Sequence, residues 1–325
     1  MVGGPPPTRQ AVIFTALAAN VAVAVAKAGA SAITGSSAML AEAIHSVADS
    51  VNEVLLLVGA RRASRPADLR HPFGHARYRY LYAFVVSLAV FWIGGVLSVL
   101  EGLDHLINRG AIVDPRWALG VLVVAALLEG WSLRTTTRAW RTVKGELSWR
   151  RLLRDTKAPE LIVVFSEDVG AIIGIAFAAI GVTLAAVTGE GSWDAVASIA
   201  IGILLMAVGL VVNRETQSLL VGEAAAVEVV KGIRDAIAGT EGIDGVRELR
   251  TIHVGPDDLV VVAGVWIDKR RSATAITRSI DQAERRVREV TPFRTVVSIE
   301  PRVRDAGSRG RAEKEGASAA GRGSS

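Results

Sequence analysis

The segment MLAEAIHSVADSVNEVLLLVG, residues 39–59, is apolar over most of its length but carries ionisable side chains in a regular pattern. A helix of about 20 mostly apolar residues can cross the ~30 Å hydrocarbon core of a bilayer. Steps of three or four positions lead from Glu42 to His45, then to Asp49, and from there to Asn52 and Glu53. Residues at this spacing lie along one face of a helix. The segment therefore predicts a membrane-spanning helix with one polar face.

Apolar runs of similar length recur on both sides of this segment. The chain has 325 residues, of which 50% are hydrophobic and only 5% aromatic, and its mean hydropathy is +0.38. Small and aliphatic residues of this kind are typical of packed membrane helices. The first run is followed directly by a second, which argues against a cleaved signal peptide. We predict a polytopic α-helical membrane protein with six transmembrane helices, at residues 11–34, 38–60, 79–100, 117–133, 160–187 and 193–212.

Positive charge is concentrated in two connections between these runs. The 37 Lys and Arg exceed the 32 Asp and Glu, and there is no cysteine, which excludes disulfides and thiolate metal sites. Because cytoplasmic loops are enriched in Lys and Arg, we expect both basic loops and both termini in the cytoplasm. Topology then accounts for the basic excess, and we expect no nucleic-acid partner. The cations are Arg61, Arg62, Arg65, Arg70, Arg77 and Arg79 in one loop, and Arg134, Arg138, Arg141, Lys144, Arg150, Arg151, Arg154 and Lys157 in the other.

The region after residue 215 has the pattern of a small α+β domain. Helical periodicity at 224–239 and 273–290 alternates with strand-like runs at 246–254, 259–268 and 295–301, in the order α-β-β-α-β. Such an order predicts three strands with two helices on one face. We therefore expect a flexible leader at 1–10, the membrane domain at 11–215, a cytoplasmic α+β domain at 216–303 and a disordered tail at 304–325.

His45 and Asp49 are the first candidate metal ligands. They lie one helical turn apart, so an imidazole nitrogen and a carboxylate oxygen can converge on one ion. This pair of donors suits zinc better than it suits calcium. The alternative is a polar seam that hydrogen-bonds to other helices or lines a dimer contact. We expect Glu42 and Glu53, nearer the two ends of the helix, to be vestibule or helix-end charges.

A second helix must complete the coordination, and the run at 160–187 offers Glu167 and Asp168. Two carboxylates in hydrocarbon must be protonated or must hold a cation. The alternative here is a structural salt bridge to Lys27 in the first run. Asn20, in the same run, is expected to form a hydrogen bond between helices.

The loop after the second run holds another group of potential ligands in RPADLRHPFGHARYRY, residues 65–80. Asp68, His71 and His75 are spaced by three and four positions, with Pro72 and Gly74 between them. This pattern predicts a metal-binding turn that leads into a helix, with a structural or regulatory role. The alternative is a solvated basic loop that faces phosphate groups.

The run GSSAMLAEAIHSVADSVNEVLLLVGARRASRPADLRHPFGHARYRYLYAF, residues 35–84, resembles the cation diffusion facilitator family of metal–proton antiporters. It is most similar to the ZnT9-like branch, and the resemblance extends over about residues 11–301. It implies six helices, a cytoplasmic ferredoxin-like domain and a homodimer. It also implies that His45, Asp49 and Asp168 form the transport site, and that Asp68, His71 and His75 form a loop site.

The chain departs from the family pattern at two places. Val164 occupies the position where the family usually has a second metal ligand four residues before Asp168, and Glu167 is the candidate replacement. A metal cluster in the cytoplasmic domain is not expected, because His253 is the only histidine there. We expect His253 to have a packed or exposed role in its strand, and His105 to lie at the end of a helix.

Together these patterns predict an efflux transporter for a divalent cation, and not an enzyme. Zinc is the first candidate, followed by Mn2+, Co2+, Ni2+, Fe2+ and Cd2+, with protons as the counter-ion and no prosthetic group. We expect the protein to reside in a bacterial-type plasma membrane. A membrane-embedded metal sensor or scaffold is the alternative, and it would need ligands only in the cytoplasm. A metal-dependent membrane hydrolase is the third reading, but no separate general base accompanies these ligands.

Overall fold

The computed structural model describes residues 9–108, 114–144 and 157–303. Its contacts divide the chain into two compact units, Met1–Val221 and Gly222–Ser325. Most of the predicted leader and the whole predicted tail at 304–325 lie outside the described residues.

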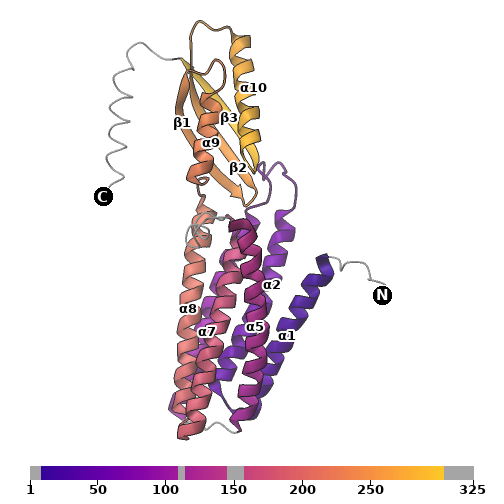
Figure 1. Ribbon diagram of the computed structural model, residues 1–325, viewed down its shortest axis with the longest axis vertical. Helices are drawn as coiled ribbons and strands as arrows, with labels where there is room; N and C mark the ends of the chain where they lie inside the picture. Colours follow the sequence, from indigo (N-terminus) through magenta and orange to yellow (C-terminus); the bar gives the residue numbers. More distant parts are fainter. Residues whose placement is uncertain (1–8, 109–113, 145–156, 304–325) are drawn as a thin grey trace, which may run out of the picture. The chain divides into compact units, whose positions relative to one another are not determined.

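The first unit is a bundle of helices (Figure 1). Five helical segments in the described ranges are long and apolar enough to cross a bilayer. In α1 the apolar helix found is Asn20–Thr34, which is shorter than the five candidate spans. The first of the six predicted spans therefore stays a prediction. The elements are α1 (Arg9–Thr34), α2 (Ser37–Ala63), α3 (Tyr78–Ala89), η1 (Val90–Val96), α4 (Leu97–Asn108), α5 (Pro115–Lys144), α7 (Pro159–Thr188) and α8 (Ser192–Val221).

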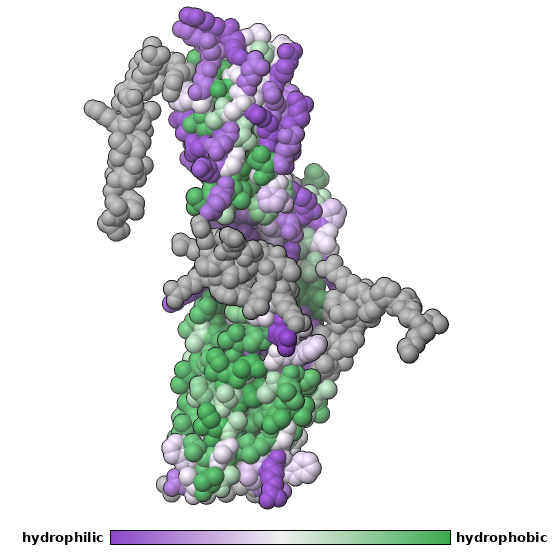
Figure 2. Space-filling model, in the orientation of Figure 1, coloured by the Kyte–Doolittle hydropathy of each residue, from purple (hydrophilic) through white to green (hydrophobic). Residues whose placement is uncertain are grey.

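The flank of this unit is apolar, as a lipid-facing surface requires. Figure 2 shows hydrophobic side chains over most of the visible face of the helices, with polar residues at one end. Val123, Val124, Leu127 and Trp131 of α5 are more than half exposed. A cluster of mostly small side chains and a few larger ones, including Met39, Leu122, Ile201 and Leu205, forms the interior.

The third predicted span is one continuous helical path with a π-helical turn, η1, at its centre. Gly95 in this turn lies against α8, where a Cβ atom would come within 2.9 Å of the Met206 backbone nitrogen. On the facing side, a Cβ on Gly202 would come within 2.7 Å of the Gly95 carbonyl oxygen. Glycine on both helices therefore permits the close approach, as small residues do between membrane helices.

A buried carboxylate from another helix caps the start of α2. Asp194, fully buried near the start of α8, accepts hydrogen bonds from the backbone nitrogens of Ser37 at 2.6 Å and Ala38 at 3.2 Å. It also accepts from the hydroxyl groups of Ser36 and Ser37. The first backbone N–H groups of a helix lack partners within it, so Asp194 supplies acceptors that the membrane cannot. The cap ties α2 to α8.

Helix α5 is longer than the sequence predicts. It ends at Lys144 and not near residue 133, so the cations Arg134, Arg138, Arg141 and Lys144 belong to a helix and not to a loop. Lys and Arg have high helix propensity, and helices often extend beyond the hydrocarbon. Of the remaining predicted loop cations, Arg150, Arg151 and Arg154 lie outside the described residues, and Lys157 precedes α7.

The second unit confirms the predicted α-β-β-α-β order. It comprises α9 (Val227–Ala238), β1 (Gly245–Gly255), β2 (Asp258–Ile267), α10 (Ala273–Val290) and β3 (Arg294–Val303). The sheet has the order β1-β2-β3, with β1 antiparallel and β3 parallel to β2. Alternate residues of β2, such as Leu259 and Val261, are buried under the two helices, which pack on one another and on one face of the sheet (Figure 1). The fold is ferredoxin-like α+β, as predicted.

Candidate metal centre

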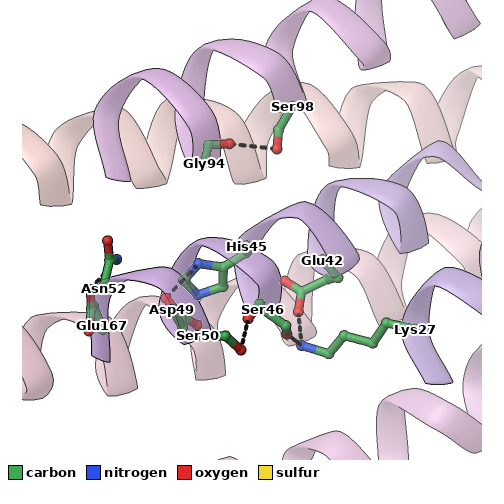
Figure 3. A network of polar contacts seen from close by, with 10 residues as sticks. All are labelled: Lys27, Glu42, His45, Ser46, Asp49, Ser50, Asn52, Gly94, Ser98 and Glu167. Atoms are coloured by element: carbon green, nitrogen blue, oxygen red, sulfur yellow. Dashed lines mark hydrogen bonds and ion pairs between the residues drawn. The ribbon is translucent and has the colours of Figure 1, made fainter. Parts of the chain in front are cut away.

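The polar face of α2 points into the helical unit. His45 is 1% exposed, and its Nδ1 atom lies 3.4 Å from Asp49 Oδ1 (Figure 3). Among the described residues, neither ring nitrogen of His45 has a hydrogen-bond partner, and the same holds for Asp49 Oδ1. Buried polar atoms are nearly always hydrogen-bonded in proteins. Donor atoms of a metal site that holds no ion would be left in this condition.

The ionisable pair of α7 is connected to two neighbouring helices. Asn52 of α2 donates a hydrogen bond to Glu167 Oε1 at 2.7 Å, and Ser132 of α5 donates one to Asp168 Oδ1 at 3.0 Å. Asp168 is buried, and Glu167 is partly buried. The adjacent carboxylates thus point in different directions, one toward α2 and the other toward α5, as the ~100° step of a helix requires.

The four predicted transport-site residues lie on helices that pack together, but their donor atoms do not converge on one position. Helix α2 packs on α7, and α7 packs on α5. Within the described part of the chain, however, only the loop group has three donor atoms all within 4.8 Å of one another. The arrangement brings His45 and Asp49 together, and links Glu167 to α2 through a hydrogen bond from Asn52.

Lys27 pairs with a different acid from the two considered in the sequence. Its Nζ atom lies 2.8 Å from Glu42 Oε2 and donates to Ser46 Oγ at 2.8 Å. Both charged side chains are fully buried, so the expectation that Glu42 is a vestibule or helix-end charge is wrong. The reason is that α1 supplies a cation at the level of Glu42, which the pattern of α2 alone could not reveal. The predicted helix–helix role of Asn20 is confirmed by its hydrogen bond to Glu53 Oε2 at 3.3 Å.

Glu129 of α5 is a further carboxylate in this region that sequence reasoning missed. It is partly buried. It lies three positions before Ser132, which contacts Asp168, so both residues share one face of α5. Its isolation in an apolar run, the same signal that singled out Glu167, could have identified it.

Val164 is the residue that the family pattern would replace by a ligand. It lies one turn before Asp168 on α7 and is 36% exposed. Its apolar side chain offers no donor atom, so the Glu167 and Asp168 carboxyl groups are the donors that this stretch of α7 can offer.

The loop group is closed, in contrast. Asp68 Oδ1 lies 3.2 Å from His71 Nδ1, and Asp68 Oδ2 lies 3.6 Å from His75 Nε2. The backbone N–H of His71 and that of Arg70 both donate to Asp68 Oδ1, and these bonds hold the pKa of Asp68 below its ordinary value, with the His71 backbone bond first among the causes. Gly74, at φ +82°, makes the turn that brings His75 back toward Asp68.

A backbone carbonyl group beside the loop group fixes the orientation of the His75 ring. Its Nδ1 atom lies 3.0 Å from the Pro66 carbonyl oxygen, which leaves Nε2 facing Asp68. The His75 ring also stacks on Tyr78 at the start of α3. An imidazole held through its second nitrogen is the usual arrangement of a metal-ligating histidine.

The remaining histidines lie elsewhere. His105 is in the last turn of α4, as predicted. His253 is buried in β1 and packs edge-to-face on Phe293 with ring centroids 4.8 Å apart, so of the two predicted roles, packed or exposed, it has the packed one. Within the described ranges, neither belongs to a group of three potential ligands.

Comparison with known proteins identifies the helical unit. The family model for the cation efflux transmembrane domain matches residues 13–221. The chain is 28% identical over 249 residues to a protein of Xenopus laevis named proton-coupled zinc antiporter SLC30A9, mitochondrial, and this match covers 76% of the chain and 44% of the relative. It is 26% identical to metal tolerance protein C4 of Arabidopsis thaliana, over 76% of the chain and 54% of the relative. The chain therefore spans about half the length of these two relatives.

A bacterial relative is matched over a larger share of its length. The magnetosome protein MamM of Paramagnetospirillum magneticum is 26% identical over 259 residues, which are 78% of this chain and 74% of that protein.

Proposed function

Because the chain belongs to the cation efflux family, whose members are transporters and not enzymes, we propose that it carries a divalent metal ion across the membrane in exchange for protons. Zinc is the first candidate substrate, since relatives in a frog and other vertebrates are named as proton-coupled zinc antiporters. Mn2+, Co2+, Ni2+, Fe2+ and Cd2+ are the other candidates.

One observation carries the proposal. His45 lies buried and Asp49 partly buried on a membrane helix, 3.4 Å apart, with donor atoms that have no hydrogen-bond partner in the described residues. Ionisable groups inside a membrane are costly and mark ion or proton pathways. In this proposal His45, Asp49 and Asp168 bind the metal, and Glu167 supplies a further oxygen or orients the site through Asn52.

Proton exchange follows from the chemistry of these donors. Imidazole and carboxylate ligands bind metal only after they lose their protons. Metal entry from one side therefore releases protons, and protons from the other side compete with the metal for the same atoms. Alternate exposure of His45 and Asp49 to the two sides couples the two fluxes in opposite directions.

We assign an accessory role to Asp68, His71 and His75. They lie in the loop between α2 and α3, outside the apolar part of the helices, and in the predicted topology this loop is cytoplasmic. A loop site can collect metal near the entrance or report its concentration, but it cannot carry an ion through the hydrocarbon.

Further parts of the proposal concern assembly and location. The basic loops favour a topology with both termini in the cytoplasm. We propose a homodimer in a bacterial-type plasma membrane, with the second unit in the cytoplasm. Support comes from the family resemblance and the charge distribution.

The test is transport by the purified protein in liposomes with an imposed pH gradient. Metal uptake is measured for Zn2+, Mn2+, Co2+, Ni2+, Fe2+ and Cd2+ with an internal fluorescent chelator, while an internal pH dye records proton movement. Uptake that collapses when the pH gradient is dissipated supports antiport. Binding of metal without uptake in any gradient would instead favour the sensor alternative, for which the closed loop group is the supporting observation.

A further inference from the structure

The Lys27–Glu42 ion pair is a fully buried charged pair of the helical unit that the proposed transport mechanism leaves unused. Both side chains have 0% exposure. Removing two charges from water costs several kcal/mol per ion unless further hydrogen bonds compensate. Here Ser46 accepts one hydrogen bond from Lys27 at 2.8 Å, but Glu42 Oε1 has no hydrogen-bond partner among the described residues.

The pair lies next to the proposed transport site. Lys27 contacts Glu42 and Ser46, and His45 lies between these two residues in the sequence of α2 (Figure 3). Glu42 and His45 are three positions apart, so their Cβ atoms are neighbours on one helix face, at about 5–6 Å. A carboxylate so close to an unpartnered imidazole is within reach of any ion bound there.

The opposite side of Glu42 is formed by a glycine. A Cβ atom on Gly174 of α7 would clash with Glu42 Oε1. The absence of a side chain at Gly174 thus leaves room for the carboxylate in the position that Lys27 gives it. The site of the pair is built from three helices, α1, α2 and α7.

We propose that Lys27 is a specificity-determining positioning residue, which holds the Glu42 carboxylate out of the coordination sphere of the metal. The inference rests on the proposed transport site at His45 and Asp49. Lys27 has two effects on the proposed transport site. Its ammonium group occupies one Glu42 oxygen, and its charge offsets that of Glu42, so the metal meets one imidazole and the carboxylates of α2 and α7 without a further acid.

Opposite effects of two single substitutions follow. In Lys27→Met the released carboxylate of Glu42 becomes an additional oxygen donor, which favours metal binding and harder ions such as Mn2+. In Glu42→Gln the ammonium of Lys27 loses its partner beside the site and repels the metal. The double variant removes both charges and restores the balance.

The experiment measures metal affinity by competition with a chelating dye, for detergent-purified full chains that also carry His71→Ala and His75→Ala, so that the signal reports the buried site. We expect Lys27→Met to tighten binding at least about tenfold and Glu42→Gln to weaken it at least about tenfold, with the double variant within about threefold of the parent. In liposomes Lys27→Met is expected to lower both KM and maximal rate, because a tightly held ion leaves slowly. Lys231→Met, at an exposed lysine of α9, is the matched control and is expected to change nothing.

Effects of the same sign in both single variants, or no change in either, would overturn the inference, since a merely structural ion pair gives losses in both. If Lys27→Met does not fold, Glu42→Gln and the double variant still decide, because only the proposed role predicts that adding Lys27→Met to Glu42→Gln restores affinity. Unchanged affinity in Asp49→Ala would refute the transport site itself. Loss of affinity in Asp49→Ala, with no opposition between Lys27→Met and Glu42→Gln, would refute the role of Lys27 alone.

Discussion

The two groups of potential ligands differ in how they are built. The loop group of Asp68, His71 and His75 comes from eight consecutive residues, and its donor atoms already lie within 4.8 Å of one another. The helix group of His45, Asp49, Glu167 and Asp168 comes from two helices, and no three of its donor atoms lie within 4.8 Å of one another. The loop group is stabilised by its own backbone hydrogen bonds. The helix group depends on how α2 packs against α7.

The difference indicates different tasks. A closed group with oriented imidazoles and two of its three residues exposed binds an ion without a change of the surrounding fold. A group divided between two helices opens or closes when the helices shift, which is what a carrier needs for release. Substitutions in the two groups should therefore affect transport in different ways.

The largest effect is expected for Asp49→Ala. Loss of this carboxylate removes half of the α2 pair, so we expect metal uptake in liposomes to fall to the level of protein-free vesicles, with unchanged folding by circular dichroism. Asp104→Ala, which removes an exposed carboxylate of α4 that accepts a hydrogen bond only from Asn108 among its described contacts, is the control. Uptake by Asp49→Ala at the parent rate would exclude α2 from the mechanism.

The next largest effects distinguish the two carboxylates of α7. We expect Asp168→Ala to weaken zinc affinity by about 100-fold or more and Glu167→Ala by about tenfold, in the range known for ligands and the residues that orient them. Competition titration gives the zinc affinity of each variant relative to that of the parent. Equal affinity of Glu167→Ala and the parent would show that Glu167 packs against Asn52 without touching the metal.

Val164→His tests the departure from the family pattern. It places an imidazole one turn before Asp168, at a position that is 36% exposed and has space for a larger side chain. Because imidazole suits zinc better than it suits harder ions, we expect the preference for Zn2+ over Mn2+ to rise by about tenfold. Val164→Leu is the size control. An unchanged preference would mean that residue 164 does not face the site.

The smallest effect is expected in the loop. Loss of both His71 and His75 should lower the uptake rate by about two- to fivefold at low metal concentration, mainly by raising KM. The reason is that the loop group only collects metal near the entrance of the transport pathway. Initial rates over a range of zinc concentrations test this. A well-folded double alanine variant without any transport would reverse the ranking of the two groups.

Local features of the fold could be predicted from the sequence. Helix α10 begins and ends at the predicted residues, because Ser272 caps its start and apolar residues recur at helical spacing. The closed loop group also depends on neighbouring residues alone. Periodicity and turn chemistry act over a few positions, and a pattern of residues records them directly.

Features that depend on distant segments could not be predicted. The partner of Lys27 was sought on α7 and is on α2, because the sequence does not say which side of α1 faces which helix. Asp194 was not recognised as the cap of α2, from which it is separated by more than 150 positions. The widened turn at η1 likewise arises where α8 packs closely on the third span.

The Asp194 cap has a mechanical consequence for the helix that carries His45 and Asp49. It attaches the first turn of α2 to α8 through four hydrogen bonds, so a tilt of α2 has its pivot near Ser37, and the part of the helix from there to Asp49 is the arm that moves. Asp49 lies roughly 18 Å along this arm at ~1.5 Å per residue, and a tilt of about 10° would displace it by roughly 3 Å. That distance is comparable to the diameter of a water molecule. A small rotation of α2 about the Asp194 cap would then suffice to move Asp49 toward the carboxylates of α7 or away from them.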